Sequence, residues 1–354
     1  NSVEETRDVL APKLTAPPTS GVIFSNEIGA ARRTAIKALV RSLPPHSRII
    51  GAEVNTLVGM HDGELAIEDH SGFALSLGAF PEAQTGSFFA KPANPGEALQ
   101  SAALREQLTA QGCLEPGWKV IVLIVAGRVA GFEAALREVQ AANPEAAIIG
   151  GVATGSWLLH AHAHKVEYVR SGVVGLMYKG NVPLKALVCK HTARPKLMEA
   201  KRQFEEEGKE LLGGLMFTCT ARDESQDAKD FASAFPRCPI VGMPSGGEIG
   251  PSASRGRRGG NNGSGATQVG HVEMQGFTSV YGLFAVPIKE RPPVDVNYED
   301  VAAAWKEGRE KPAAMELAAA AATAAEVAAS EGPDDAEDDD EEDEEDDEDE
   351  YDEE

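Results

Sequence analysis

A pattern of strand, helix, strand and glycine occurs three times along the chain, and this repeat constrains the fold more than any other feature. In each copy a short apolar run ends in a leading glycine, and at least one more glycine follows within eight residues. The leading glycines, 99 and 92 residues apart, are Gly51, Gly150 and Gly242. Self-similarity at a nearly fixed spacing indicates an architecture built from repeated units.

The segments around each leading glycine repeat as well. An apolar strand is expected upstream of it, at residues 21–24, 120–125 and 214–219. A helical pattern lies between that strand and the glycine, as Ile36, Leu39 and Val40 show in the first copy. Each helix should stop near a proline, because proline cannot continue a helix; the prolines are Pro44, Pro144 and Pro236. A further strand closes each copy, at residues 71–77, 171–177 and 275–284.

The repeated unit is therefore β-α-β-loop-β. Its first strands are continuous apolar runs, which are typical of strands covered on both faces. We predict an α/β fold of mixed sheets with packed helices, in which Ile49, Ile148 and Ile240 lie on buried, mutually similar strands. The alternative is three unrelated α/β stretches with ordinary glycine turns, but four matching features in the same order favour a repeat.

Charge is concentrated at one end of the chain. The net charge is -23, yet 20 of the 56 acidic residues lie in residues 331–354, which contain no basic residue. We expect a disordered acidic tail there, a linker at 1–20, and a Pro/Ala-rich segment with a helix at 289–330. The remaining body has no general basic footprint for nucleic acid. It also lacks the run of roughly 18 apolar residues that a membrane span needs.

The four cysteines, Cys113, Cys189, Cys219 and Cys238, are far apart and form no C-x-x-C pair. This spacing argues against a zinc module or a disulfide scaffold and favours a reducing compartment. We expect the cytoplasm or the nucleus. A plastid stays open, because a targeting segment could precede Asn1.

Four ordered blocks in the last third of the chain carry a family resemblance. They are residues 214–219 (GLMFTC), 235–242 (FPRCPIVG), 247–251 (GEIGP) and 276–284 (GFTSVYGLF). Together they resemble the FIST family, named for F-box and intracellular signal transduction proteins, whose blocks read G-A-L-x-F-S-C, F-P-x-x-P-x-x-G, G-E-I-G-P and G-F/Y-T-S-V-x-x-x-F. This chain departs from the family in having Ala221 before Arg222 and no cysteine in residues 192–196.

The resemblance implies two linked FIST-like domains, residues 21–195 and 210–288. The short join between them resembles the F-box branch, although residues 1–354 show no F-box helix pattern. The resemblance implies a non-enzymatic module like the substrate-recognition part of an F-box ubiquitin-ligase subunit. Its partner would be a degradation substrate, and also a Skp-type adaptor if an F-box precedes Asn1. The alternative is a sensory domain for a small ligand, such as an amino acid, in intracellular signal transduction.

The best site candidate is the expected loop that contains Gly246, Gly247, Glu248 and Gly250. Glycines let backbone N–H groups approach a ligand, and Glu248 could bind a ligand amine or a basic side chain of a partner. The alternative is a tight turn whose carboxylate points into water.

Cys219 and Arg222 leave the end of an apolar strand and complete the candidate site. Cys219 would be a nucleophile only beside a base, and a buried cysteine that packs as a small hydrophobe is more common. Arg222 could pair with Glu248. No Ser/His/Asp order, H-E-x-x-H motif or paired-carboxylate motif is evident, so we expect neither an enzyme nor a cofactor.

Two other groups favour structural explanations. His160, His162 and His164 alternate as on one face of a strand and could bind zinc, but a solvated hairpin is the simpler interpretation. Arg255, Arg257 and Arg258 could contact RNA or an acidic partner. Three arginines give only a small electrostatic contribution to such binding, so a disordered insertion is favoured.

Overall fold

Two mixed sheets build the part of the chain that the computed structural model describes, residues 17–288 except 27, 62–63, 69–71, 81, 95–96, 237 and 253–270. The predicted acidic tail, the Pro/Ala-rich segment, most of the predicted linker and the Arg255–Arg258 group lie outside the described residues. No helix of the described part is long and apolar enough to span a bilayer.

The smaller sheet has five strands in the order β10-β9-β2-β1-β5. β1 and β2 are parallel and are joined by α2, whereas β5, β9 and β10 run antiparallel to their neighbours. The elements are β1 (Ser20–Ser25), α2 (Ala30–Ser42), β2 (Arg48–Glu53), β5 (Phe73–Gly78), β9 (Leu158–His162) and β10 (Lys165–Val169).

The larger sheet has eleven strands, eight of them in the order β12-β16-β13-β14-β8-β7-β11-β6. Those eight are β6 (Gln84–Ala90), β7 (Val120–Ala126), β8 (Ala147–Ala153), β11 (Gly172–Lys179), β12 (Leu184–Cys189), β13 (Lys209–Cys219), β14 (Ile240–Pro251) and β16 (Ser279–Pro287). β15 (Val272–Gln275) and β3 (Leu57–His61) also pair with β14, and β4 (Glu64–Glu68) pairs with β3.

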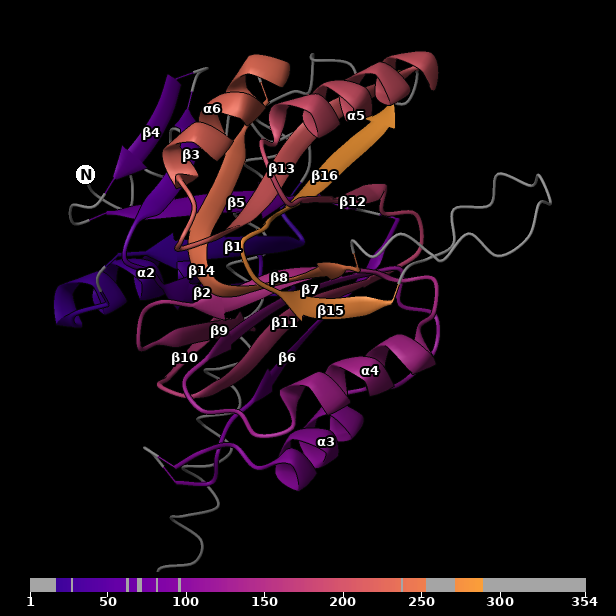
Figure 1. Ribbon diagram of the computed structural model, residues 1–354. Coiled ribbons are helices and arrows are strands. Elements are labelled where there is room, and N and C mark those ends of the chain that lie inside the picture. Colours follow the sequence, from indigo (N-terminus) through magenta and orange to yellow (C-terminus); the bar gives the residue numbers. More distant parts are fainter. Residues whose placement is uncertain are drawn as a thin grey trace, which may run out of the picture. The chain divides into compact units, whose positions relative to one another are not determined.

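Helices cover the outer faces of the sheets in two neighbouring pairs and one single helix (Figure 1). α3 (Ser101–Ala110) and α4 (Phe132–Ala142) cover β7 and β11. α5 (Arg194–Glu206) and α6 (Glu224–Ala234) cover β13 and β16. α2 covers β1 and β2 alone through Ile36, Leu39 and Val40.

The predicted repeat is confirmed as three parallel β-α-β units, β1-α2-β2, β7-α4-β8 and β13-α6-β14. Each helix ends two residues before its proline. The predicted marker residues Ile49, Ile148 and Ile240 are buried on the second strands.

The three leading glycines occupy the same position in their units. Gly51, Gly150 and Gly242 lie opposite Ile23, Leu123 and Met216 on the neighbouring first strand. A Cβ on any of them would press into the carbonyl oxygen of that partner. The glycines are therefore required by close backbone approach between two parallel strands.

The strand segments that follow the leading glycines pair with strands of another unit. Through these pairings each unit is joined to both of the others. β3 of the first unit pairs with β14 of the third, and β9 of the second pairs with β2 of the first. The distal half of β14 pairs with β8 of the second unit. Pairing between β14 and β8 thus crosses the predicted division at residues 195–210, where α5 lies; the division into two domains stays a prediction.

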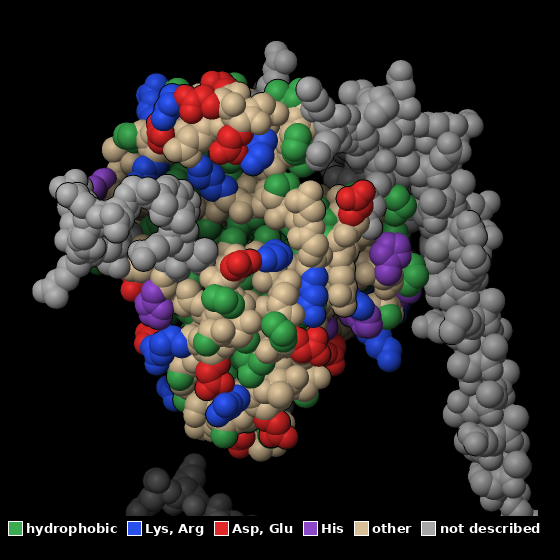
Figure 2. All heavy atoms as spheres, turned by 90° about the vertical axis from the view of Figure 1, so that its right-hand side faces the viewer, with side chains coloured by type: hydrophobic (Ala, Val, Ile, Leu, Met, Phe, Trp, Pro, Cys, Tyr) green, Lys and Arg blue, Asp and Glu red, His purple; other side chains and the backbone are tan. Residues whose placement is uncertain are grey.

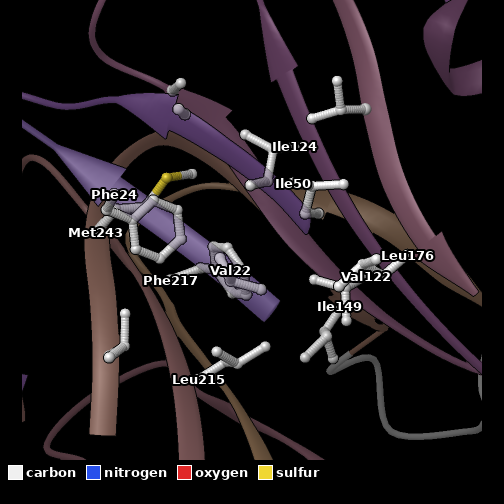
Figure 3. Packing of buried hydrophobic residues seen from close by; sticks show 14 of the residues in the cluster. Val22, Phe24, Ile50, Val122, Ile124, Ile149, Leu176, Leu215, Phe217 and Met243 are labelled. Atoms are coloured by element: carbon white, nitrogen blue, oxygen red, sulfur yellow. The ribbon is translucent and has the colours of Figure 1, made fainter. Parts of the chain in front are cut away.

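The two sheets pack face to face around a core drawn from all three units. Phe24 of β1 meets Phe217 of β13 edge-on, with ring centroids 6.3 Å apart. Figure 3 shows Met243 beside this pair, and Ile50, Ile124 and Leu176 continuing the layer. Along β1, Val22 and Phe24 face this core while Ile23 faces α2, as alternation along a strand requires. This shared core therefore joins the two sheets.

The surface that faces the viewer in Figure 2 carries acidic and basic side chains interspersed with one another. Both signs of charge therefore meet on this face of the described part.

Candidate functional site

The expected glycine loop is a strand, which corrects the prediction. Residues 245–250 lie within β14, because this stretch pairs with β8 on one side and β15 on the other. The glycines permit a bulge and close packing rather than a ligand cradle. Gly246 lies in the bulge and is exposed, whereas Gly247 packs on Met274 and Gly250 packs on Val280.

Glu248 is fully buried, so its carboxylate does not point into water. Its Oε2 accepts hydrogen bonds from the backbone N and the Oγ1 of Thr278, at 3.2 and 2.8 Å. Its Oε1 has no hydrogen-bond partner among the described residues. Burial raises the pKa of Glu248, and the hydrogen bonds from Thr278 oppose that rise only in part. Glu248 is thus a buried support for Thr278 and not an exposed anchor.

Arg222 pairs with Asp227 of α6 instead of Glu248. Its Nε and Nη2 donate to the two carboxylate oxygens of Asp227, at 2.9 and 2.7 Å. Its remaining donors reach the backbone carbonyls of Lys190, His191 and Phe277. One guanidinium therefore ties the segment after β12 and the segment before β16 to α6.

Asp227 is the centre of a buried polar network that the sequence did not reveal. Its Oδ2 also accepts from the hydroxyls of Thr218 and Ser279, and its backbone carbonyl accepts from the Tyr281 hydroxyl. The hydrogen bond to Asp227 is the main cause of the raised pKa of Arg222. A buried ion pair with this many hydrogen bonds fixes geometry firmly.

Cys219 lies at the end of β13, beside the same network. It is buried, and its backbone N donates to the Thr278 carbonyl at 3.0 Å. The other three cysteines are also buried, and burial raises the pKa of Cys113, Cys189 and Cys238 to about 12. A thiol with so high a pKa is protonated and inert at neutral pH, which agrees with packing as the role of these three residues.

A shallow hollow lies between the two segments whose backbone carbonyls Arg222 binds. Its volume is about 460 Å³, and it is lined by Lys190, His191, Glu273, Met274, Gln275, Gly276, Phe277 and Thr278. Sequence reasoning missed every one of these as a site residue. Phe277 was expected to lie within a strand, but it precedes β16, has a φ of 57° and is 70% exposed.

The histidines do not form a metal site in the described part of the chain. His160 and His162 lie on β9, but His164 lies in the turn to β10 with a φ of 63°. The Nε2 of His160 is 2.9 Å from Ser87 Oγ, and burial lowers the pKa of His160 to about 4. Among the described residues no group of three His, Cys, Asp or Glu side chains is placed to hold a metal ion.

Comparison with known proteins did not identify a family for the chain. No protein-family model matches the chain, and a search of curated proteins found no matching relative. The resemblance to the FIST family therefore stays a prediction carried by the four sequence blocks.

Proposed function

We propose that this chain is a non-enzymatic recognition module that binds a protein partner through the surface around Phe277. We call this surface the Phe277 rim and define it as Lys190, His191, Met274 and Phe277. The observation that carries the proposal is that Phe277 is 70% exposed while its backbone has a φ of 57°.

Both the positive φ and the exposed ring of Phe277 lower the stability of the free protein. A residue with a side chain in the left-handed backbone region costs roughly 1–2 kcal/mol, and an exposed ring does not gain the free energy of hydrophobic burial. Such outliers persist where the surroundings enforce them, and they cluster at functional sites. Exposed aromatic side chains on a rigid base are also common anchors of protein interfaces.

The base beneath the ring is rigid. Arg222 donates a hydrogen bond to the Phe277 carbonyl, at 3.4 Å. Glu248 accepts hydrogen bonds from the backbone N–H and the hydroxyl of Thr278. Met274, 40% exposed, extends the apolar surface beside the ring. Lys190 and His191 are exposed across the hollow and would favour acidic side chains around an apolar anchor on the partner.

The FIST resemblance suggests what such a partner would be. In that setting the Phe277 rim would select degradation substrates for a ubiquitin ligase of the Skp–cullin–F-box type. The body would supply recognition, and attachment to a Skp-type adaptor would need an F-box that precedes Asn1.

The test is affinity purification from cells with three matched baits. The wild type should bring down a reproducible set of proteins, and Phe277→Gly should lose them. Met198→Ala is the control, because Met198 is 44% exposed on α5 and is not among the residues that line the hollow. Retention of the same set by Phe277→Gly would overturn the proposal.

A second function, sensing of a small zwitterion, is favoured by the charges around the hollow. Lys190 and Glu273 line the same space of about 460 Å³, so an amino acid could meet opposite charges there. A ligand that binds only the folded state raises its melting temperature. A thermal-shift screen with the common amino acids, repeated on Lys190→Met, would separate this function from protein recognition.

A further inference from the structure

We propose a second binding site, for a phosphate monoester, at the cluster formed by Arg33, Arg170, Trp157 and Tyr168. This site belongs to the smaller sheet, does not depend on the Phe277 rim and involves no residue predicted from the sequence. It lies where the first unit meets the β9-β10 hairpin of the second.

The geometry is that of two cations on one aromatic ring. The guanidinium carbon of Arg33, on α2, lies 3.9 Å from the ring centroid of Trp157, and that of Arg170 lies 4.7 Å from the same centroid. Arg33 is also 5.1 Å from the ring of Tyr168. Its Nε donates to the carbonyl of Ile28 at 3.0 Å, which fixes the side chain in place.

Within the described part of the chain, neither Arg33 nor Arg170 has an acidic partner. No described carboxylate lies within ion-pair distance of Arg33 or Arg170, although several other arginines and lysines have one. The carboxylate of Glu53 accepts hydrogen bonds from the backbone N–H groups of Ile28 and Ser156 and is not within ion-pair distance of either described arginine. Both guanidinium groups contact one ring, and an anion bound at this cluster would offset the repulsion between their charges.

A third donor is available in the same cluster. The hydroxyl of Tyr168 is buried, and none of the residues that the structure describes forms a hydrogen bond with it. An unpaired buried hydroxyl costs about 1–3 kcal/mol, so a ligand oxygen that accepts its proton would be favoured.

The position in the fold agrees with ligand binding. Arg33 lies near the start of α2, and Ile28 lies between β1 and that helix. The cluster is therefore at the carboxyl ends of the parallel strands β1 and β2, where ligands of α/β sheets commonly bind.

The charges select a phosphate monoester over a carboxylate. A phosphate monoester carries about -1.5 to -2 at neutral pH and three acceptor oxygens. It can neutralise both guanidinium groups and accept the Tyr168 hydroxyl, whereas one carboxylate neutralises only one cation. Guanidinium forks also match phosphate oxygens in pairs. The phosphate could belong to a free metabolite or to a phosphorylated side chain of another protein.

Trp157 makes the site directly measurable. Titration of the full chain with O-phosphoserine, and separately with inorganic phosphate at matched ionic strength, should give a saturable change in tryptophan fluorescence. Trp157→Phe should abolish the change. Arg33→Gln and Arg170→Gln should each weaken binding at least about tenfold, as expected for loss of one charge-assisted hydrogen-bonding group. The exposed Arg137→Gln on α4 is the charge-matched control and should bind like the wild type.

Thermal melting of each variant distinguishes loss of binding from loss of folding. Arg170 is exposed, so Arg170→Gln should stay folded, and Arg33→Lys retains the charge but removes the fork. A phosphoserine peptide that binds far more tightly than O-phosphoserine would identify a protein source for the phosphate, and equal affinities would identify a small molecule. The proposal is overturned by the absence of a saturable signal at millimolar ligand, or by equal binding of the wild type and folded Arg170→Gln.

Discussion

The Arg222 guanidinium and the Asp227 carboxylate form a two-point ion pair that is almost excluded from solvent, with side-chain exposures of 14% and 3%. The pair joins the start of α6 to two segments that are more than 30 residues away on either side. Because the Phe277 carbonyl is one of its attachments, this pair positions the Phe277 rim as well as stabilising the fold.

Removing the acid from this pair should be strongly destabilising. Asp227→Ala leaves a guanidinium and two hydroxyls without their shared acceptor, and breaking a buried pair costs about 3–5 kcal/mol. Urea unfolding followed by circular dichroism should show this loss. Glu199→Ala, which breaks the exposed pair with Arg202, should cost far less, because solvent screens exposed ion pairs. Similar losses for the two variants would contradict a special role for Asp227.

The leading glycines should tolerate no side chain. Gly51→Ala and Gly150→Ala would drive a Cβ into the carbonyl oxygens of Ile23 and Leu123, and the forced strand separation should cost about 2 kcal/mol or more. Gly246→Ala is the control, because its added Cβ would have no neighbour closer than 3.8 Å. Thermal melting should rank both repeat variants well below Gly246→Ala. A melting temperature of Gly51→Ala equal to that of the control would show that the units do not need this close approach.

The three units were predictable because their signals are local. Apolar runs, helical spacing and helix-stopping prolines all lie within about 30 residues of each leading glycine. The pairing of strands between units was not predictable. For example, β3 and β14 pair across roughly 180 residues, and neither sequence segment indicates which strand it will pair with. Long-range pairing with β8, together with pairing to β15, likewise made the expected glycine loop part of β14.

The candidate site was predictable only in pieces. Cys219, Arg222 and Glu248 do lie around Thr278, but the partner of Arg222 was missed. A signal existed: Asp227 and Asp230 fall on the apolar stripe of α6, where a buried acid needs a partner. No such signal in the sequence pointed to Phe277. Its exposure follows from the positive φ before β16, whereas the residues around it read as a continuous strand.

The strain at Phe277 predicts a variant that is at least as stable as the wild type. Phe277→Gly removes a ring that is mostly solvated and relieves the left-handed backbone. The gain is about 1 kcal/mol at most, because glycine also increases the entropy of the unfolded chain. Calorimetry should show an equal or higher melting temperature. Phe277→Ala keeps the strain and should not gain; a clear loss on Phe277→Gly would mean that the ring stabilises the fold.

His160 should make stability fall in mild acid. Burial lowers its pKa from 6.5 to about 4 in the folded state, so between these values the unfolded chain binds the extra proton. Stability therefore rises with pH across that window, by up to about 3 kcal/mol if the full shift holds. Histidine NMR titration should place the His160 transition near 4. His160→Gln should flatten the pH dependence of unfolding between 4 and 6.5, and an unchanged slope would assign it to other groups.

Glu248 should act in the opposite sense, at its own pH window. Its pKa is raised above the ordinary 4.5 by burial, so the folded state holds a proton that the unfolded state has released. The stabilising contribution of Glu248 is complete below 4.5 and is lost as pH rises through the folded-state pKa. Above its raised folded-state pKa the carboxylate is charged and buried, and no described residue donates a hydrogen bond to Oε1. Glu248→Gln retains an acceptor for Thr278 and removes the charge. The variant should therefore be more stable than the wild type above that pKa, and this advantage should vanish in acid below 4.5. Glu199→Gln, on the exposed surface of α5, is the control for general charge effects. Unfolding curves at a series of pH values test the prediction, and an advantage of Glu248→Gln that does not grow as pH rises from below 4.5 would show that the ionised carboxylate is favourable where it lies.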